Sequence, residues 1–200
     1  EALSFTLNVI CDAGDEIIIP EPFYANYNGF AATCSVEVVP VVSHFENQFE
    51  LPPIETLKEK ITDKTRAILI CNPSNPTGYL YSESDVKALI DLAVVNDIFI
   101  IVDEVYREFI YAEKSHYSVL KSEKGSQYAV MIDSVSKRYS LCGARVGCMI
   151  SKNQELIATA LKFAHLRLSP PALALMASEA AISAPPSYLD DVKKEYEKRK

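Results

Sequence analysis

Polar and aromatic side chains follow four apolar segments of this chain, where we expect strands to end. Each stands directly after its segment or a few residues beyond it, and the four are Tyr24, Asn75, Asp103 and Lys137. In an open α/β sheet, ligands bind outside the carboxyl ends of the strands. We therefore expect these side chains to meet at one site. Their types suit a planar, charged, phosphorylated ligand that carries an aldehyde.

Lys137 is the side chain that can bond to an aldehyde. An amine that forms such a bond must spend time neutral, and a partly desolvated, cation-rich site favours the neutral amine. Lys137 follows a predicted buried strand, with Arg138 beside it and Arg145 eight positions later. A lone lysine is usually a surface charge, so the prediction depends on these neighbours.

A phosphate group is bound well by hydroxyls and by a planar guanidinium that reaches two oxygens at once. Ser134, Ser136 and Arg145 provide these groups within one short segment. Arg145 stands between Gly143 and Gly147, which would let the backbone approach a ligand closely. The simpler alternative is an ordinary loop with an exposed arginine.

A carboxylate is expected beside the ring nitrogen of such a ligand. A nearby negative charge raises the pKa of a pyridine nitrogen, and the protonated ring then withdraws electrons from the reacting carbon. Asp103 directly follows the apolar residues 98–102, although an aspartate at a strand end is often a helix N-cap or a turn residue. Asn75 and Tyr106 can hydrogen-bond a ring hydroxyl, and Tyr24 can stack on the ring face.

Short apolar segments alternate with segments of helical periodicity along the chain. We expect strands at residues 16–20, 35–42, 66–71, 98–102, 128–132 and 146–150. We expect helices at residues 1–10, 54–61, 82–93, 153–165, 172–182 and 190–200, the third of which begins with a capping box at Ser82 and Asp85. Nearly continuous apolar strands are typical of a sheet buried on both faces. The alternation predicts an α/β fold with a mostly parallel sheet and helices on both faces.

The composition excludes several classes of function. The 200 residues carry a net charge of −7, which argues against nucleic acid or an anionic membrane surface as partner. No apolar run approaches the roughly 20 residues of a membrane span, and no glycine-rich motif is present that would cradle the pyrophosphate of a nucleotide. The five cysteines lack CxxC spacing and the three histidines are isolated. We therefore expect reduced, mostly buried thiols and no metal site.

Three motifs resemble those of class I/II aminotransferases, which are fold-type I enzymes that depend on pyridoxal 5′-phosphate (PLP). They are residues 72–78 (NPSNPTG), 103–106 (DEVY) and 134–145 (SVSKRYSLCGAR), in the family's order and with its spacing. The resemblance runs along the whole chain and is to the aspartate aminotransferase-like branch.

The resemblance implies a role for each residue of the predicted site. Lys137 is expected to hold PLP covalently and to act as general base, while Asp103 pairs with the pyridine nitrogen. Asn75 and Tyr106 are expected to contact the ring hydroxyl. The other groups would bind the phosphate or stack on the ring: Ser134, Ser136 and Arg145 for the phosphate, and Tyr24 or the adjacent Phe23 for the ring.

The implied reaction is the transfer of an amino group between an amino acid, here an aspartate-like one, and a 2-oxo acid. A C–S β-lyase or a cyclopropane-forming synthase of the same fold would carry the same cofactor residues, so these alternatives stay open. A non-catalytic PLP-sensing module of a transcription regulator is a further alternative. The acidic composition disfavours it, because such a protein needs a basic face for DNA. The family also implies a cytoplasmic homodimer.

The resemblance further implies that this chain is part of a longer protein. We expect residues 1–184 to form the PLP-binding large domain without its N-terminal part, and its last strand, residues 146–150, to run antiparallel. Residues 185–200 would begin a helix that leads to a small domain, which carries the arginine for the substrate carboxylate. A chain without these parts is expected to bind PLP weakly and to be inactive alone.

Overall fold

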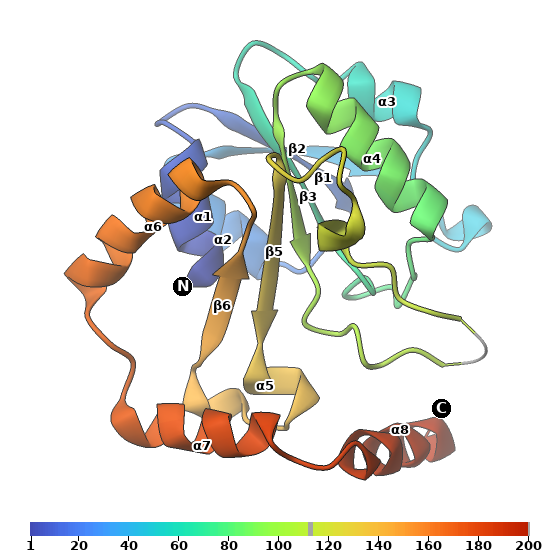
Figure 1. The fold of residues 1–200 in the computed structure, drawn as a ribbon. Helices are drawn as coiled ribbons and strands as arrows, with labels where there is room; N and C mark the ends of the chain where they lie inside the picture. Colours follow the sequence, from blue (N-terminus) through green and yellow to red (C-terminus); the bar gives the residue numbers. More distant parts are fainter. Residues whose placement is uncertain (112–113, 200) are drawn as a thin grey trace.

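The computed structural model describes residues 1–111 and 114–199, and their strands form one six-stranded sheet (Figure 1). The order is β2-β1-β3-β4-β5-β6, in which the first five strands are parallel and β6 is antiparallel to β5. The bounds are β1 (Glu16–Glu21), β2 (Glu37–Val42), β3 (Thr65–Cys71), β4 (Phe99–Asp103), β5 (Ala129–Ser134) and β6 (Gly147–Ile150). The predicted α/β fold, with its antiparallel last strand, is confirmed.

The sheet is buried on both faces because its central strands alternate between two apolar clusters. Ile18 belongs to the cluster under α3 and α4, whereas the adjacent Ile17 belongs to the cluster under α1, α2 and α6. Both isoleucines are completely buried. Figure 1 shows these two helix layers on opposite sides of the strands. The bounds are α1 (Ala2–Ile10), α2 (Asn26–Thr33), α3 (Ile54–Lys58), α4 (Glu83–Val95) and α6 (Gln154–Arg167).

Helix α4 begins as the sequence predicts, whereas α2 was not expected. At the start of α4, Ser82 Oγ accepts a hydrogen bond from the Asp85 N–H (3.1 Å), and the Asp85 carboxylate accepts one from the Ser82 N–H (2.8 Å). Helix α2 has no side-chain cap and contains Gly29, which lowers its helix propensity. It is stabilised instead by the burial of Tyr27 and Ala31 against the sheet.

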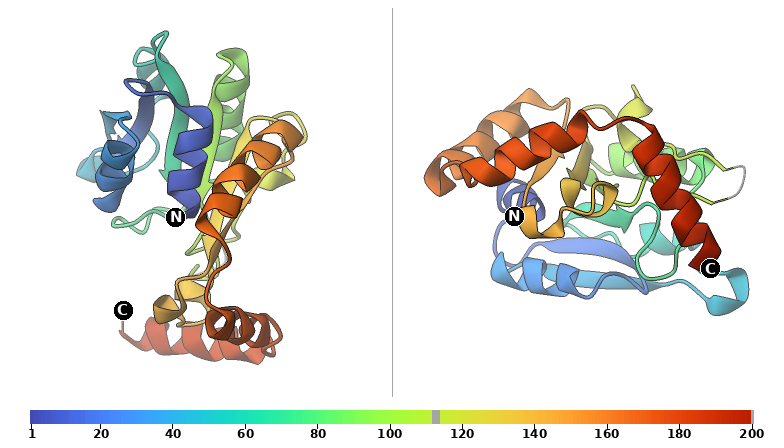
Figure 2. Two further views of the ribbon diagram at one scale, coloured as in Figure 1. Left: turned by 90° about the vertical axis from the view of Figure 1, so that its left-hand side faces the viewer. Right: turned by 90° about the horizontal axis from the view of Figure 1, so that it is seen from below.

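Helices α7 (Ala172–Ile182) and α8 (Ser187–Arg199) lie beyond the end of the sheet toward which the parallel strands point (Figure 2). Helix α7 contacts the short helix η3 (Cys142–Ala144), and the ring of Tyr196 in α8 lies edge-on to Phe109, with centroids 5.6 Å apart. The predicted helix at residues 190–200 forms the main part of α8, and residue 200 lies outside the described residues. These helices therefore border the end of the sheet where the site was predicted.

The thiols are distributed differently from the expectation. All five are free, but Cys71 alone is buried, while Cys142 and Cys148 are exposed and the other two are partly buried. The prediction of mostly buried thiols is wrong because Cys148 lies in β6, the edge strand, and Cys142 lies in η3 just before it. In the described part of the chain, no helix is long and apolar enough to cross a membrane.

Candidate active site

The carboxyl ends of β3, β4 and β5 open onto a cavity of about 270 Å³. The structure brings all eight side chains predicted for the site to its lining: Tyr24, Asn75, Asp103, Tyr106, Ser134, Ser136, Lys137 and Arg145. They come from segments far apart in the sequence, which the parallel strands bring to the same end of the sheet, the end formed by their carboxyl termini. An adjoining hollow of about 380 Å³ shares part of this lining and extends to the start of α1. The cavity is therefore the candidate active site.

Asp103 is the last residue of β4, and two donors hold its carboxylate. The Tyr27 hydroxyl donates to Oδ2 (2.9 Å) and the Val105 N–H donates to Oδ1 (3.2 Å). Burial raises the pKa of Asp103 above its ordinary value, while these two hydrogen bonds oppose the shift. Burial and the neighbouring Asp103 raise the pKa of Tyr27 well above 10, so the phenol remains a donor.

Tyr27 is a member of the site that the sequence analysis missed. It lies on α2, a helix that was not predicted, and is only 2% exposed. Seventy-six positions separate it from Asp103, so nothing in the local sequence connects the two. The available signal was its position one helical turn after Tyr24, which would place both rings on one face of a helix.

Lys137 lies in α5 (Val135–Arg138), a single turn that directly follows β5. Its Nζ lies over the ring of Tyr106, 5.6 Å from the centroid. Within residues 1–111 and 114–199, Nζ makes no hydrogen bond or ion pair. Arg138 does not supply the free positive charge that its position suggested, because its guanidinium is paired with Glu108 and Asp133.

The predicted phosphate-binding groups lie on two adjacent turns. Ser134 caps α5 by accepting a hydrogen bond from the Ser136 N–H (3.2 Å). Arg145 has a left-handed backbone (φ 56°), and its Nη1 donates to the Cys142 carbonyl (2.7 Å). Gly147 has a different role from the one expected: a Cβ there would lie 2.8 Å from the Asp133 carbonyl. That glycine permits the close pairing of β6 with β5 rather than an approach to a ligand.

The structure separates the two aromatic side chains that could face a ring. Tyr24 lines the cavity and is 39% exposed, and its hydroxyl accepts a hydrogen bond from Asn26 Nδ2 (2.7 Å). Phe23 packs on the apolar cluster next to Tyr27, with ring centroids 6.3 Å apart, and does not line the cavity. Of the two candidates Phe23 and Tyr24, it is therefore Tyr24 that is available to a ligand in this cavity.

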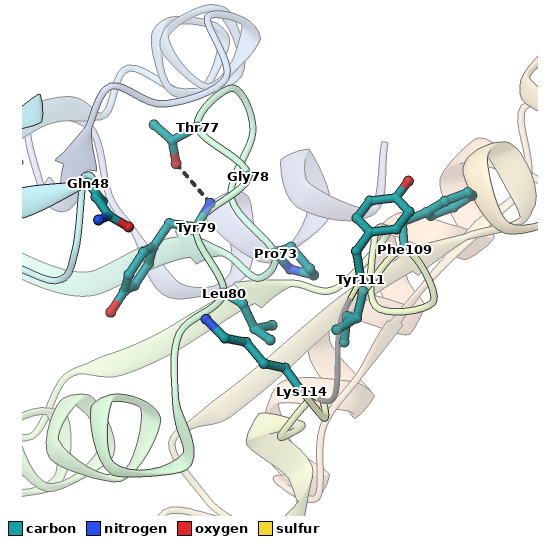
Figure 3. A pocket seen from close by; sticks show the side chains of 10 residues that line it. Gln48, Pro73, Thr77, Gly78, Tyr79, Leu80, Phe109, Tyr111 and Lys114 are labelled. Carbon is teal, nitrogen blue, oxygen red and sulfur yellow. Dashed lines mark hydrogen bonds between the residues drawn. The ribbon is translucent and has the colours of Figure 1, made fainter. Parts of the chain in front are cut away.

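A larger pocket of about 420 Å³ is lined in part by residues 77–80, which follow the loop of Asn75 in the sequence (Figure 3). Its lining includes Thr77, Tyr79 and Lys114 but none of the eight predicted residues. The dashed line in Figure 3 is the hydrogen bond from the Tyr79 N–H to Thr77 Oγ1 (3.2 Å), which closes the loop on itself. The acid, amine, hydroxyl and guanidinium groups converge in the smaller cavity, so we place the chemistry there.

Comparisons with known proteins agree with this geometry. Residues 1–200 match the family model described as "Aminotransferase class I and II". An aspartate aminotransferase of Bacillus subtilis (strain 168) is 34% identical over 199 residues, which are 99% of this chain and 50% of that protein. The crystal structure of an aromatic aminotransferase from Pyrococcus horikoshii OT3 superposes with a TM-score of 0.90 at 29% identity, covering 99% of this chain and 53% of that one. An alanine aminotransferase from Pyrococcus furiosus gives a TM-score of 0.88 at 30% identity, with 99% and 51% covered.

The chain spans about half the length of the curated relatives that it matches. The match to the family model extends over every residue of the chain. This chain belongs to the family of class I and II aminotransferases.

Proposed function

We propose that this chain forms the PLP-binding part of an enzyme that transfers an amino group between an amino acid and a 2-oxo acid. The observation that carries the proposal is that all eight predicted side chains line one cavity at the carboxyl ends of β3, β4 and β5. The cavity contains an amine that can bond to an aldehyde, a carboxylate that can pair with a ring nitrogen, and a guanidinium that can bind a phosphate. Proteins with an open α/β sheet bind ligands at the carboxyl ends of the strands.

The donor set of the cavity fits PLP. Two hydroxyls and Arg145 match a phosphate, because a guanidinium binds two of its oxygens at once. Asp103, held by hydrogen bonds from Tyr27 and Val105, matches a protonated ring nitrogen. Tyr24 is available to stack on the ring, and the two groups proposed for the ring hydroxyl are Asn75 and Tyr106.

The residues then divide the work of the reaction. When bound, PLP supplies an aldehyde that bonds to amines and a ring that withdraws electrons. Burial raises the pKa of Asp103, and the hydrogen bonds from Tyr27 and Val105 oppose that shift by favouring the carboxylate. The carboxylate form would keep the ring nitrogen protonated. Lys137 removes the proton from the α carbon of the substrate as general base, and its Nζ is available because no carboxylate pairs with it among the described residues.

We propose an aspartate-like amino donor because the curated relatives from Bacillus subtilis, Geobacillus stearothermophilus and Pyrococcus abyssi are aspartate aminotransferases. The remaining expectations stand as proposals of the same kind. They are a large domain at residues 1–184, residues 185–200 as the start of the connection to a small domain, a homodimer, and a location in the cytoplasm.

The test uses the full-length protein with PLP, aspartate and a 2-oxo acid. We expect conversion of aspartate to its keto acid, and covalent labelling of Lys137 after borohydride reduction. Lys137→Ala should lose about 10⁴-fold in rate, the upper range for one positioned acid–base group, while Lys152→Ala on the surface should not. Release of pyruvate and ammonia from a sulfur-containing donor, without amino transfer, would identify a β-lyase instead. Labelling of another lysine would contradict the assignment of Lys137.

A further inference from the structure

Four charged side chains behind the cavity form a closed ring of ion pairs. Arg107 Nη1 lies 2.9 Å from Asp133 Oδ2, and Arg138 Nη2 lies 3.5 Å from the same oxygen. Arg138 Nη2 also lies 3.2 Å from Glu108 Oε1, which is 3.8 Å from Arg107 Nε. We call these residues the charge ring: Arg107, Glu108, Asp133 and Arg138.

The charge ring joins the two turns that carry the candidate chemistry. Arg107 and Glu108 directly follow Tyr106 in the turn after β4, whereas Arg138 directly follows Lys137 in α5. Asp133 lies between these turns at the end of β5, and its Oδ1 also accepts a hydrogen bond from the Ser134 N–H (2.8 Å). The ring therefore reaches the segments of both the amine and the proposed phosphate-binding hydroxyls.

None of the four members lines the cavity itself. Asp133 lines the adjoining hollow, whereas Arg107, Glu108 and Arg138 line neither space. The ring contains two cations and two carboxylates, and it adds no net charge to the site. It is also largely enclosed: the side chains of Asp133 and Arg138 are 10% and 14% exposed. Enclosed pairs are less screened by solvent and ions than surface pairs, so the four side chains are held together firmly. Because the ring has no net charge, it acts as a mechanical link rather than as a source of electric field.

Helix α5 needs such a link. It has four residues, and a single helical turn is not stable by itself because nucleation costs more than its few hydrogen bonds return. The Nε and Nη2 atoms of Arg138 are buried and make no hydrogen bond within the described residues, so the ion pairs are what hold this guanidinium. Since Lys137 precedes Arg138, fixing the guanidinium fixes the orientation of α5.

We propose that the charge ring positions Lys137, holding Nζ over Tyr106 and directed into the cavity, so that its four members are positioning residues. The inference rests on the proposed function, since it assigns a role to the ring through Lys137. It predicts that loss of one member slows the reactions of Nζ by a larger factor than it weakens the binding of a ring and phosphate, because Nζ lies at the end of a long side chain in α5 and most of the other proposed binding groups lie outside that helix.

The experiment uses the full-length protein freed of cofactor, with Arg138→Met as the main variant. Added PLP should bond to Lys137: Nζ joins the aldehyde carbon and the carbonyl oxygen leaves as water. We expect the rate of this step, followed by visible absorbance, to fall about tenfold to a hundredfold, because a displacement of about 1 Å has effects of that size. Affinity for pyridoxamine phosphate, which has no aldehyde, should fall by a smaller factor than this rate, because Asn75, Asp103 and Arg145 lie outside α5.

Two further variants keep the test decisive. Glu108→Gln removes a ring member with little change in shape, so it tests the proposal if Arg138→Met does not fold, and it should slow the same step. The double variant Arg138→Met/Glu108→Gln keeps the neutral pair of Arg107 and Asp133, and it should react no more slowly than Arg138→Met. Arg138→Lys, which keeps the charge, should restore part of the rate.

The matched control is Arg66→Met, at the opposite end of the sheet. Arg66 pairs with Asp15 at 3.0 Å and is more exposed than Arg138 (42% against 14%), and it lies in β3 at the end of the sheet away from Lys137. An unchanged bonding rate in Arg138→Met and Glu108→Gln, or an equal fall in Arg66→Met, would overturn the positioning role. Failure of the wild-type protein to bond PLP at Lys137 would instead overturn the proposed function, and the two results are distinguishable.

Discussion

The two ends of the parallel strands use polar side chains in opposite ways. At the amino end, Arg66 Nη2 and Nε lie 3.0 and 3.1 Å from the Asp15 carboxylate, and Glu16 accepts a hydrogen bond from Thr62 (2.7 Å). At the carboxyl end, Lys137 makes no ion pair within the described residues. Polar groups at the amino end satisfy one another and complete the structure, whereas at the carboxyl end the paired charge ring leaves Lys137 with capacity for a ligand.

The distribution of unsatisfied atoms shows the same difference. In residues 1–111 and 114–199, the buried side-chain atoms without a hydrogen-bond partner belong to Asn72, Glu104, His116 and Arg138. All four residues lie on the segments that follow β3, β4 and β5 at their carboxyl ends. Buried polar groups normally have hydrogen-bond partners. A cluster of buried groups without such partners therefore marks the end of the sheet where residues serve function at the expense of stability.

The largest expected contrast is between two aspartates, one at each end. Asp103→Asn removes the charge opposite the proposed ring nitrogen, and we expect turnover to fall about a hundredfold or more, as for other preorganised electrostatic groups. Asp15→Asn should lower the free energy of unfolding and leave turnover unchanged. Steady-state kinetics and urea unfolding on both variants check this. Wild-type turnover in Asp103→Asn would contradict the pairing.

A second contrast concerns pH and His116. Burial lowers the pKa of His116 from 6.5 to about 4, with Arg107 and Lys121 also lowering it and Glu108 opposing them. The unfolded chain takes up this proton near pH 6.5 but the folded chain does not. The free energy of unfolding should therefore fall by about 2 kcal/mol as the pH drops from 6.5 to 4. Glu104 has the opposite sign, since burial raises its pKa and its stabilising contribution is lost as the pH rises.

Comparison of His116→Gln with the wild-type protein isolates the histidine from Glu104. The variant should lose the part of the pH dependence between 4 and 6.5 that the histidine contributes. Chemical unfolding at several pH values measures it. Identical slopes for the two proteins would show that folding does not lower the pKa of His116.

A third contrast is between two tyrosines that hydrogen-bond aspartates. Tyr27→Phe removes the donor to Asp103, and we expect a rate loss of about tenfold, the typical cost of one hydrogen bond to a charged group. Because that bond lowers the pKa of Asp103, the acid limb of the rate profile should move to higher pH. Tyr128→Phe removes the matching bond to Asp97 (3.0 Å) at the amino end and should leave the profile unchanged. Equal profiles for the two variants would contradict a role for Tyr27.

The smallest effect is expected for Arg66→Met. The guanidinium is 42% exposed, and exposed or half-exposed ion pairs contribute about 1 kcal/mol or less. Turnover should be unchanged, because the pair lies at the end of the sheet away from the cavity. A rate loss comparable to that of Tyr27→Phe would show that the two ends are not independent.

Local patterns in the sequence were sufficient for most of the architecture. Burial on both faces of the sheet makes β3 and β4 near-continuous apolar segments, and the capping box of Ser82 and Asp85 marks the start of α4. Helix α2 and the exposed thiols were not predicted correctly, because burial against the sheet and an edge position in it are not local properties. The residues proposed for the cofactor follow β1, β3, β4 and β5 or lie in the connection from β5 to β6, so the strand pattern alone predicts that they lie at one end of the sheet.

The sequence by itself determined which segments become strands and which side chains follow them, since periodicity and caps act over a few residues. Only the tertiary structure decided that Tyr27 reaches Asp103 across 76 positions, and that Arg138 pairs with Glu108 rather than standing free beside Lys137. Those contacts depend on the strand order and on the packing of the turns beyond β4 and β5. Both are set by the apolar clusters as a whole, and no short segment of the chain contains that information.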